Sequence, residues 1–211
     1  MNRIFADISN NNSDRHFNFE AYREAGHRVI GIKATEGIGF IDPFHDQWCA
    51  RAHQKAKLHV IHYHFGHVGQ SPQTQGEFFW AHVKPRFGRN DFLCIDIEGG
   101  GVDGHGIDAT AAWTNDFANH LIKVSGHHPV GYSNESELRE LVKAGVRLPT
   151  NRWWIAAYGP SRPSIGGVKT WAWQYSNGVI GPQPHEAPGV GKGDMSKLNR
   201  GTALRLRFAR V

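Results

Sequence analysis

Asp96 and Glu98 are the two residues whose types and spacing point most directly to chemistry. They close the segment DFLCIDIE at residues 91–98, which is otherwise largely apolar. Residues two apart in a strand point to the same side, so the two acids would share one face with Phe92 and Cys94. Because two like charges held close together and away from water disfavour double ionisation, the pKa of one acid rises. Such a pair can keep one carboxyl group protonated near neutral pH.

A pair of this kind supplies the chemistry of glycosidic bond cleavage. One carboxylic acid protonates the leaving oxygen, and a second carboxylate stabilises the positive charge on the sugar or attacks it directly. An Asp-x-Glu pattern can also form salt bridges or cap a loop. The apolar strand around the pair, and the acids Asp7 and Asp194 at other predicted strand ends, favour the catalytic interpretation.

The elements that must position these acids follow from short apolar runs that alternate with segments of helical period. Strands are predicted at residues 3–8, 28–34, 58–65, 91–98, 128–133, 152–158, 170–176 and 193–195, and helices at residues 17–26, 44–57, 73–87 with a break at Pro85, 113–124 and 135–144. Strand followed by helix, repeated through most of the chain, implies a parallel sheet.

Roughly eight strands in about 200 residues fit an irregular TIM-like β/α barrel of the α/β class, with helices missing in the late repeats. An open doubly wound sheet is the alternative, but the glycine-rich phosphate loop common in that class is absent from the sequence. We expect a single catalytic domain over residues 1–211, with a core at residues 4–198 and a C-terminal tail at residues 199–211. The alternation of Leu204, Leu206 and Phe208 with arginines in the tail is compatible with an edge strand or a basic strip that binds a wall, and we favour the edge strand.

In a β/α barrel the active site lies at the carboxyl ends of the strands, so the residues there are the candidates for catalysis and binding. The candidate catalytic acids are Asp7, Asp96, Glu98 and Asp194, and the candidate substrate-binding residues are Tyr63, Tyr132, Tyr158, Trp173 and Gln174. Aromatic rings among them would stack on sugar faces and exclude water. We therefore expect carboxylates and aromatic side chains to converge on one end of the barrel.

Histidines offer a different chemistry. His62 and His64 are two apart on a predicted strand and His67 follows shortly, and a His-x-His pair with nearby acids can bind zinc. That would indicate a metal-dependent amidase or deacetylase. No third ligand can be placed, so we favour hydrogen-bonded histidines and predict no metal or other cofactor. A non-catalytic sugar-binding module on the same scaffold is a further alternative, which the presence of both Asp96 and Glu98 disfavours.

Composition narrows the classes of partner. The net charge of +5 and the pI of about 9.4 favour polyanionic partners, whether nucleic acid, an anionic membrane or an anionic cell wall. No nucleic-acid recognition motif accompanies this charge, and no apolar run is long enough to span a bilayer. We therefore expect neither nucleic-acid binding nor membrane insertion, and we expect a monomer. Cys49 and Cys94 form no Cys-x-x-Cys pair, so we predict two free buried thiols.

Eight motifs, in order, resemble glycoside hydrolase family 25, the Chalaropsis-type lysozymes. They are FADISNNN, VIGIKATEG, VIHYHF, LCIDIE, GYSN, WWIAAY, WAWQYS and GDMSKLN, spread over residues 4–198. The resemblance implies an irregular β/α barrel with N-acetylmuramidase activity. Such enzymes cleave the β-1,4 bond between N-acetylmuramic acid and N-acetylglucosamine in bacterial peptidoglycan.

The resemblance also implies roles for single residues. Glu98 matches the proton donor and Asp96 the adjacent acid, which acts as nucleophile, as electrostatic helper, or beside an attacking acetamido group of the substrate. Asp7 and Asp194 match orienting acids at the first and last strands. Tyr63, Tyr132, Tyr158 and Gln174 match positions that line the groove. The motif GDMSKLN is less apolar than the VDLN-like stretch typical of the family, so the match is weakest at Asp194.

The first residues, MNRIFADISNNN, contain no long apolar stretch of the kind found in secretory signals. A cell-wall hydrolase without such a signal needs another route to its substrate. Phage endolysins accumulate in the host cytoplasm until a holin opens the membrane. We therefore expect a phage or prophage endolysin that stays in the host cytoplasm until lysis and then acts on the cell wall.

Overall fold

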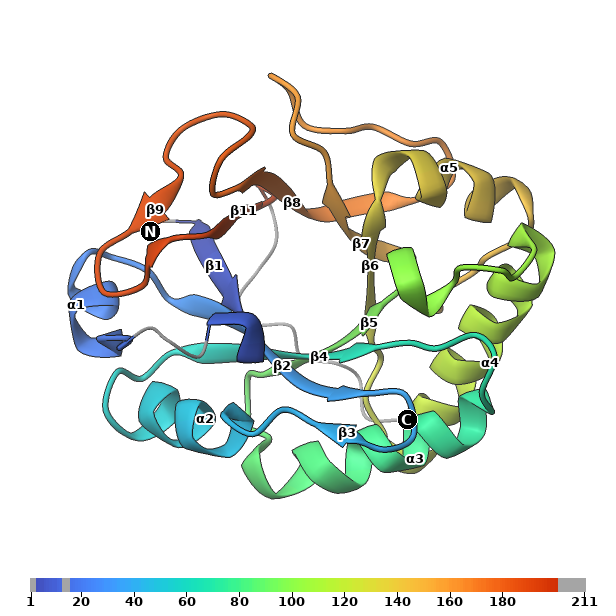
Figure 1. Ribbon diagram of the computed structural model, residues 1–211, viewed down its shortest axis with the longest axis horizontal. Helices are drawn as coiled ribbons and strands as arrows, with labels where there is room; N and C mark the ends of the chain where they lie inside the picture. Colours follow the sequence, from blue (N-terminus) through green and yellow to red (C-terminus); the bar gives the residue numbers. More distant parts are fainter. Residues whose placement is uncertain (1–2, 13–15, 201–211) are drawn as a thin grey trace.

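The computed structural model describes residues 3–12 and 16–200, so the strand predicted around residues 204–208 lies outside the described residues. Its strands form a ring that helices surround over most of its circumference (Figure 1). The wall consists of β1 (Ile4–Ile8), β2 (Val29–Glu36), β4 (His59–Phe65), β5 (Phe92–Asp96), β6 (Val130–Asn134), β7 (Arg152–Ala156), β8 (Lys169–Asn177) and β11 (Asp194–Leu198). Because β1 pairs both with β2 and with β11, the sheet closes on itself. The predicted β/α barrel is confirmed.

Five α-helices pack outside this wall in the described part of the chain. They are α1 (Phe19–Glu24), α2 (His45–Gln54), α3 (Pro72–Val83), α4 (Ile107–Ser125) and α5 (Glu135–Lys143), with short 3-10 turns η1 (Asn10–Asn12), η2 (Lys84–Arg86) and η3 (Gly99–Gly101). None of these described helices is long and apolar enough to cross a membrane. The connections from β7 to β8 and from β8 to β11 contain no helix among the described residues, which confirms the irregular late repeats.

Local chemistry explains where several helices begin and end. The Ser71 side chain accepts a hydrogen bond from the first turn of α3, and Pro72 occupies the first helical position, where its missing N–H is not needed. The same helix ends at Val83 and continues as η2, because Pro85 cannot continue the α-helical hydrogen bonding. Asn134 caps α5 by accepting a bond from the backbone N–H of the third helical residue.

The last strand runs in a direction that the sequence pattern did not predict. Repeated strand–helix units implied a parallel sheet, but β11 pairs antiparallel with both β8 and β1. Residues 178–193, which include the short strands β9 (Glu186–Ala187) and β10 (Gly191–Lys192), return the chain without a crossover helix, so the next strand must run back. Asp194 is therefore the first residue of β11 and lies opposite Asn177, at the end of β8.

Alternating residues of β5 separate two parts of the core, as predicted. Phe92 and Cys94 are buried in a cluster inside the barrel. Leu93 and Ile95 are buried in a second cluster with residues of the surrounding helices, such as Phe117 of α4. Cys94 thus lies in the barrel interior, whereas Cys49 is on α2 and packs in a cluster outside the barrel wall. Both thiols are buried and free, as predicted.

A glycine on β2 makes room for one of the candidate acids. A Cβ atom added to Gly31 would lie 2.6 Å from the Cβ of Asp7 and 3.2 Å from the Trp154 ring. Gly31→Ala should therefore shift Asp7 and lower the free energy of unfolding by about 1–3 kcal/mol. Urea unfolding measures the change, and Gly39→Ala is the control because no heavy atom lies within 4 Å of its added Cβ. Equal stability of the two variants would contradict the tight packing.

Candidate active site

A pocket of about 250 Å³ opens at the carboxyl ends of the parallel strands. Its lining residues are Asp7, Ser9, Asn11, Lys33, Tyr63, Phe65, Asp96, Glu98, Tyr132, Trp154, Tyr158, Gln174 and Asp194. Eight of the nine residues predicted from the sequence are among them, including all four acids. Asp194 reaches this rim because β11 starts here and runs back through the barrel wall.

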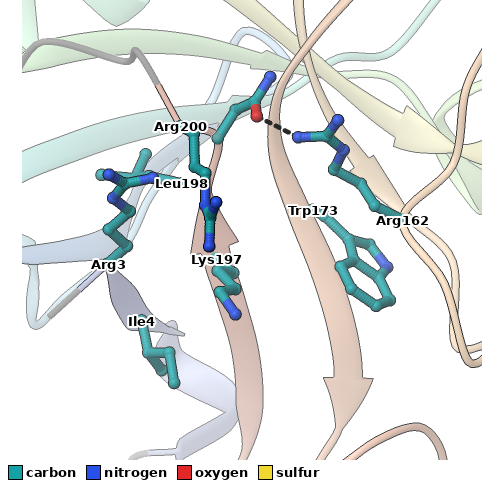
Figure 2. Close-up of a pocket in the computed structure, with 8 residues that line it drawn as sticks. Arg3, Ile4, Arg162, Trp173, Lys197, Leu198 and Arg200 are labelled. Carbon is teal, nitrogen blue, oxygen red and sulfur yellow. Dashed lines mark hydrogen bonds between the residues drawn. The ribbon is translucent and has the colours of Figure 1, made fainter.

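Trp173 is the exception, because it does not line this pocket. Neighbouring residues of a strand point to opposite faces, so Trp173 points outward where Gln174 points inward. Its indole N–H donates to the Ala157 carbonyl over 2.6 Å. The ring lines a separate pocket on the outside of the barrel, near Arg162 and on the opposite side of that pocket from Arg3 (Figure 2).

Asp96 is the most deeply buried member of the candidate catalytic pair. It is the last residue of β5, is 6% exposed, and its Oδ1 atom has no hydrogen-bond partner. Burial raises the pKa of Asp96 well above its ordinary value, the nearby charge of Glu98 raises it further, and Lys33 opposes both effects. A buried polar atom without a partner is rare in folded proteins, which makes this oxygen available to a ligand.

Glu98 follows the strand in an extended conformation, at the start of η3. Burial raises its pKa to about 7, and the charges of Glu137 and Asp194 contribute, while a hydrogen bond with Tyr132 acts in the opposite direction. Glu137 was not predicted from the sequence. It stands in the first turn of α5, where Asn134 Nδ2 donates to its carboxylate over 3.0 Å. Glu98 can therefore carry a proton near neutral pH and release it to a substrate.

Gln174 joins the aromatic side of the pocket to Asp7. Its Oε1 atom accepts hydrogen bonds from the hydroxyls of Tyr132 and Tyr158, each over 2.9 Å. With the amide oxygen so engaged, the amide nitrogen faces Asp7 and donates to Oδ2 over 3.2 Å. Burial and the charge of Asp194 raise the pKa of Asp7, and the bond from Gln174 partly offsets them.

Lys33 contributes a positive charge that the sequence analysis did not single out. It lies on β2, is 8% exposed, and its ammonium donates to Glu36 over 2.6 Å. The same nitrogen lies 5.3 Å from the centre of the Phe65 ring. The signal in the sequence was a lysine within the otherwise apolar run VIGIKA, two residues after Gly31 on the face that points into the barrel.

An aromatic floor supports the pocket. The Tyr132 ring meets Trp154 edge-on, with centroids 4.9 Å apart, and the Trp154 indole N–H donates to Ser196 Oγ over 2.9 Å. Tyr63 closes one side, and its hydroxyl donates to the Ile8 carbonyl over 3.3 Å. Because these partners fix the rings, the pocket presents rigid apolar faces suited to stacking against a sugar.

The three histidines considered for zinc do not converge at this pocket. His64 lies 2.8 Å from Thr35 Oγ1 and 3.0 Å from Gln75 Oε1, fully buried behind the barrel wall. His67 contacts Glu36 over 3.0 Å. His62 is on β4, as His64 is, and lies in another cluster outside the barrel wall. The amidase alternative required these residues to act together beside the acids, and their positions contradict it.

Comparison with known proteins points to one family. The family model for glycosyl hydrolases family 25 matches residues 6–182. The autolytic lysozyme of Clostridium acetobutylicum is 30% identical over 170 residues, which is 77% of this chain and 49% of that protein. The N,O-diacetylmuramidase of Chalaropsis is 30% identical over 128 residues, or 56% of this chain and 61% of the relative. The chain thus spans about half to three fifths of these relatives.

A solved structure supports the same fold. The catalytic domain of endolysin ply40 from bacteriophage P40 of Listeria monocytogenes superposes with a TM-score of 0.74 and 17% identity. The match covers 96% of this chain and 95% of that domain. At this identity the likeness concerns the arrangement of strands and helices.

Glu98 should make the stability of the fold depend on pH. Its pKa rises from an ordinary 4.5 to about 7 on folding, so between these values the unfolded chain loses a proton that the folded chain keeps. Its stabilising contribution is complete below about pH 4.5 and is lost as the pH rises through about 7. The difference in unfolding free energy between Glu98→Gln and the unmodified protein should therefore favour the variant more at about pH 8 than at about pH 4. Urea unfolding at the two pH values measures this difference.

The exposed Glu24 provides the control for this measurement. Glu24→Gln should change the unfolding free energy by the same small amount at both pH values. A difference between the unmodified protein and Glu98→Gln that does not vary with pH would show that the Glu98 carboxyl titrates normally in the fold.

Proposed function

The chain belongs to glycosyl hydrolases family 25, and from that premise we propose that it is a lysozyme acting on bacterial peptidoglycan. The proposed reaction is that of an N-acetylmuramidase, the hydrolysis of the β-1,4 bond between N-acetylmuramic acid and N-acetylglucosamine. One observation carries the proposal. Buried Asp96 and a Glu98 whose pKa is about 7 line the same pocket, two residues apart in the chain.

In the proposed mechanism Glu98 protonates the glycosidic oxygen as the bond to the leaving sugar breaks. A pKa near 7 suits this role, because the group is protonated in a useful fraction at neutral pH and is acidic enough to give the proton up. Asp96 faces the carbon that becomes positively charged and stabilises it as a carboxylate, directly or by orienting the substrate acetamido group. After cleavage Glu98 accepts a proton from the water that completes hydrolysis.

The remaining polar residues hold the substrate and tune the pair. Asp194 raises the pKa of Glu98 through its charge. Gln174 positions Asp7 by donating a hydrogen bond to its carboxylate. Tyr158 is 36% exposed at the mouth of the pocket, where its ring can lie against a sugar. Lys33 is the cation available to offset part of the charge that develops on Asp96 when a proton leaves.

Replacing the acids tests these roles. Glu98→Gln keeps the shape of the side chain but cannot donate the proton, so the rate of peptidoglycan cleavage should fall by at least about 100-fold, which is the contribution of a positioned acid. Asp96→Asn should cause a loss of the same order. The measurement is mass spectrometry of soluble fragments, which should carry new reducing ends at N-acetylmuramic acid.

Glu140→Gln on the exposed face of α5 is the matched control and should leave the rate unchanged. Reducing N-acetylglucosamine ends would mean a glucosaminidase, and released peptides would mean an amidase. Unchanged cleavage by Glu98→Gln would remove this residue from the mechanism.

We further propose that the protein acts as an endolysin, reaching the wall from the host cytoplasm when the membrane is opened. The ply40 catalytic domain has the same barrel, and a net charge of +5 favours contact with an anionic wall. Bacteria expressing the protein alone should remain intact and should lyse when the membrane is permeabilised with chloroform. Cells expressing Glu98→Gln should not lyse after the same treatment. Lysis without permeabilisation would contradict the proposal.

A further inference from the structure

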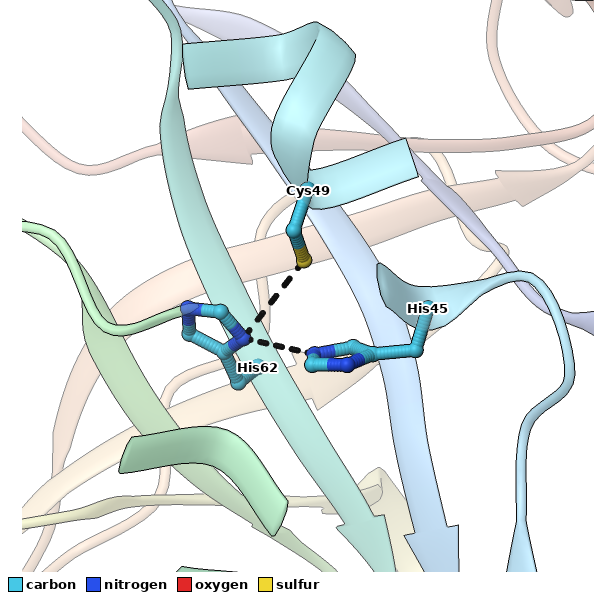
Figure 3. Close-up of side chains that lie close together, drawn as sticks. All are labelled: His45, Cys49 and His62. Atoms are coloured by element: carbon cyan, nitrogen blue, oxygen red, sulfur yellow. Dashed lines mark hydrogen bonds between the residues drawn. The ribbon is translucent and has the colours of Figure 1, made fainter. Parts of the chain in front are cut away.

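A second cluster of reactive side chains lies behind the barrel wall, outside the pocket that holds the acids. His45 and Cys49 come from α2, one helical turn apart, and His62 comes from β4. All three side chains point toward one another between the helix and the strand (Figure 3). Each residue is 0% exposed, and the proposed glycosidase mechanism uses none of them.

The distances within this cluster suit a metal ion. His45 Nε2 lies 2.8 Å and Cys49 Sγ 3.8 Å from His62 Nδ1, and the three possible ligand atoms lie within 4.8 Å of one another. Zinc bonds of about 2.0–2.1 Å to nitrogen and about 2.3 Å to sulfur place tetrahedral ligand atoms roughly 3.3–3.7 Å apart. The distance from Cys49 Sγ to His62 Nδ1 is already near this range. The distance from His45 Nε2 to His62 Nδ1 has to increase by about 0.5 Å.

Asp91 fixes which nitrogen of His62 faces the cluster. Its carboxylate accepts hydrogen bonds from the backbone N–H groups of Val60 and Gly88, over 2.9 and 2.7 Å. His62 Nε2 lies 3.1 Å from the same carboxylate, and because a carboxylate only accepts, this nitrogen carries the hydrogen. His62 Nδ1 therefore presents its lone pair to His45 and Cys49. A carboxylate behind a ligating histidine is the usual support of a zinc site.

His45 has a corresponding partner on its far side. Its Nδ1 atom lies 3.1 Å from Nε2 of His82 on α3, so His45 can donate from Nδ1 while its Nε2 lone pair turns to an ion. His82 is only partly buried and lies near exposed Asp46. His45, Asp46 and His82 also bring ligand atoms within 4.8 Å of one another. This outer group connects the buried cluster to the exposed Asp46 side chain.

We propose that His45 Nε2, Cys49 Sγ and His62 Nδ1 bind one zinc ion. Cys49 gives its proton to solvent as the Zn–S bond forms, so a thiolate balances one positive charge. Asp91, which also contacts His53 over 2.8 Å, lies behind His62 and offsets part of the other. A fourth position stays open to a solvent molecule. Such an ion fastens α2 to β4 and acts on stability, separately from the carboxylate pocket.

Spectroscopy of the intact protein tests the site. Co²⁺ replaces Zn²⁺ in tetrahedral sites, and a cobalt–thiolate bond absorbs strongly in the near ultraviolet. Titration of the metal-free protein with Co²⁺ should produce this band, saturating at about one ion per chain, and an equal amount of Zn²⁺ should abolish it. Zn²⁺ at about a hundredfold excess over its Kd should raise the melting temperature by about 5–10 °C.

The second buried cysteine supplies the matched control. Cys49→Ser should lose the cobalt band and the zinc-dependent rise in melting temperature, whereas Cys94→Ser, inside the barrel, should keep both. The unmodified protein alone decides the main question, so a variant that folds poorly does not block the test. Absence of the band in the unmodified protein, or its persistence in Cys49→Ser, would overturn the proposal and leave a hydrogen-bonded chain of neutral histidines.

Discussion

The concentration of negative charge at one end of the barrel is the constraint on which the rest of the structure depends. Four carboxylates and one lysine are among the described residues that line the pocket. Water would stabilise all four charges, but burial removes much of it and raises the pKa of Asp7, Asp96 and Glu98. The fold therefore has to hold together groups that repel one another when ionised.

The closed barrel does this by drawing the acids from strands far apart in the chain. Asp7 is the penultimate residue of β1 and Asp194 is the first residue of β11. These two strands pair side by side where the barrel closes (Figure 1). Gln174 bonds to Asp7 and to two tyrosines, so the acids, the amide and the aromatic rings form one connected unit. A rigid wall of this kind keeps charge where a substrate needs it, because the side chains cannot move apart to relieve the repulsion.

The polar side chains between the barrel wall and the surrounding helices are arranged differently. His62 and His64 on β4 point outward, and His62 meets His45, Cys49 and Asp91 between strand and helix. On the inner face of the same strand Tyr63 borders the acid pocket. One strand thus separates two polar regions, one open to solvent at the barrel mouth and one enclosed. This separation lets the enclosed cluster bind an ion without disturbing the charges of the pocket.

The sequence by itself determined the strands of the barrel wall, the main helices and the side of each strand that faces the barrel. Alternation along β5 placed Asp96 inward and Ile95 outward, because side-chain direction in a strand depends only on local backbone geometry. The same rule separates Trp173 from Gln174, although both were first assigned to the groove. The helical spacing of apolar residues likewise predicted the helices, and Pro85 predicted the break at the end of α3.

Only the tertiary structure decided which distant residues meet. The antiparallel direction of β11 depends on how residues 178–193 return the chain, and no local period encodes that path. The place of Lys33 beside the acids, and the joining of His45 and Cys49 to His62, depend on pairing between strands and on packing of helices against them. These contacts arise from closure of the barrel, which brings together segments that the sequence pattern describes one at a time.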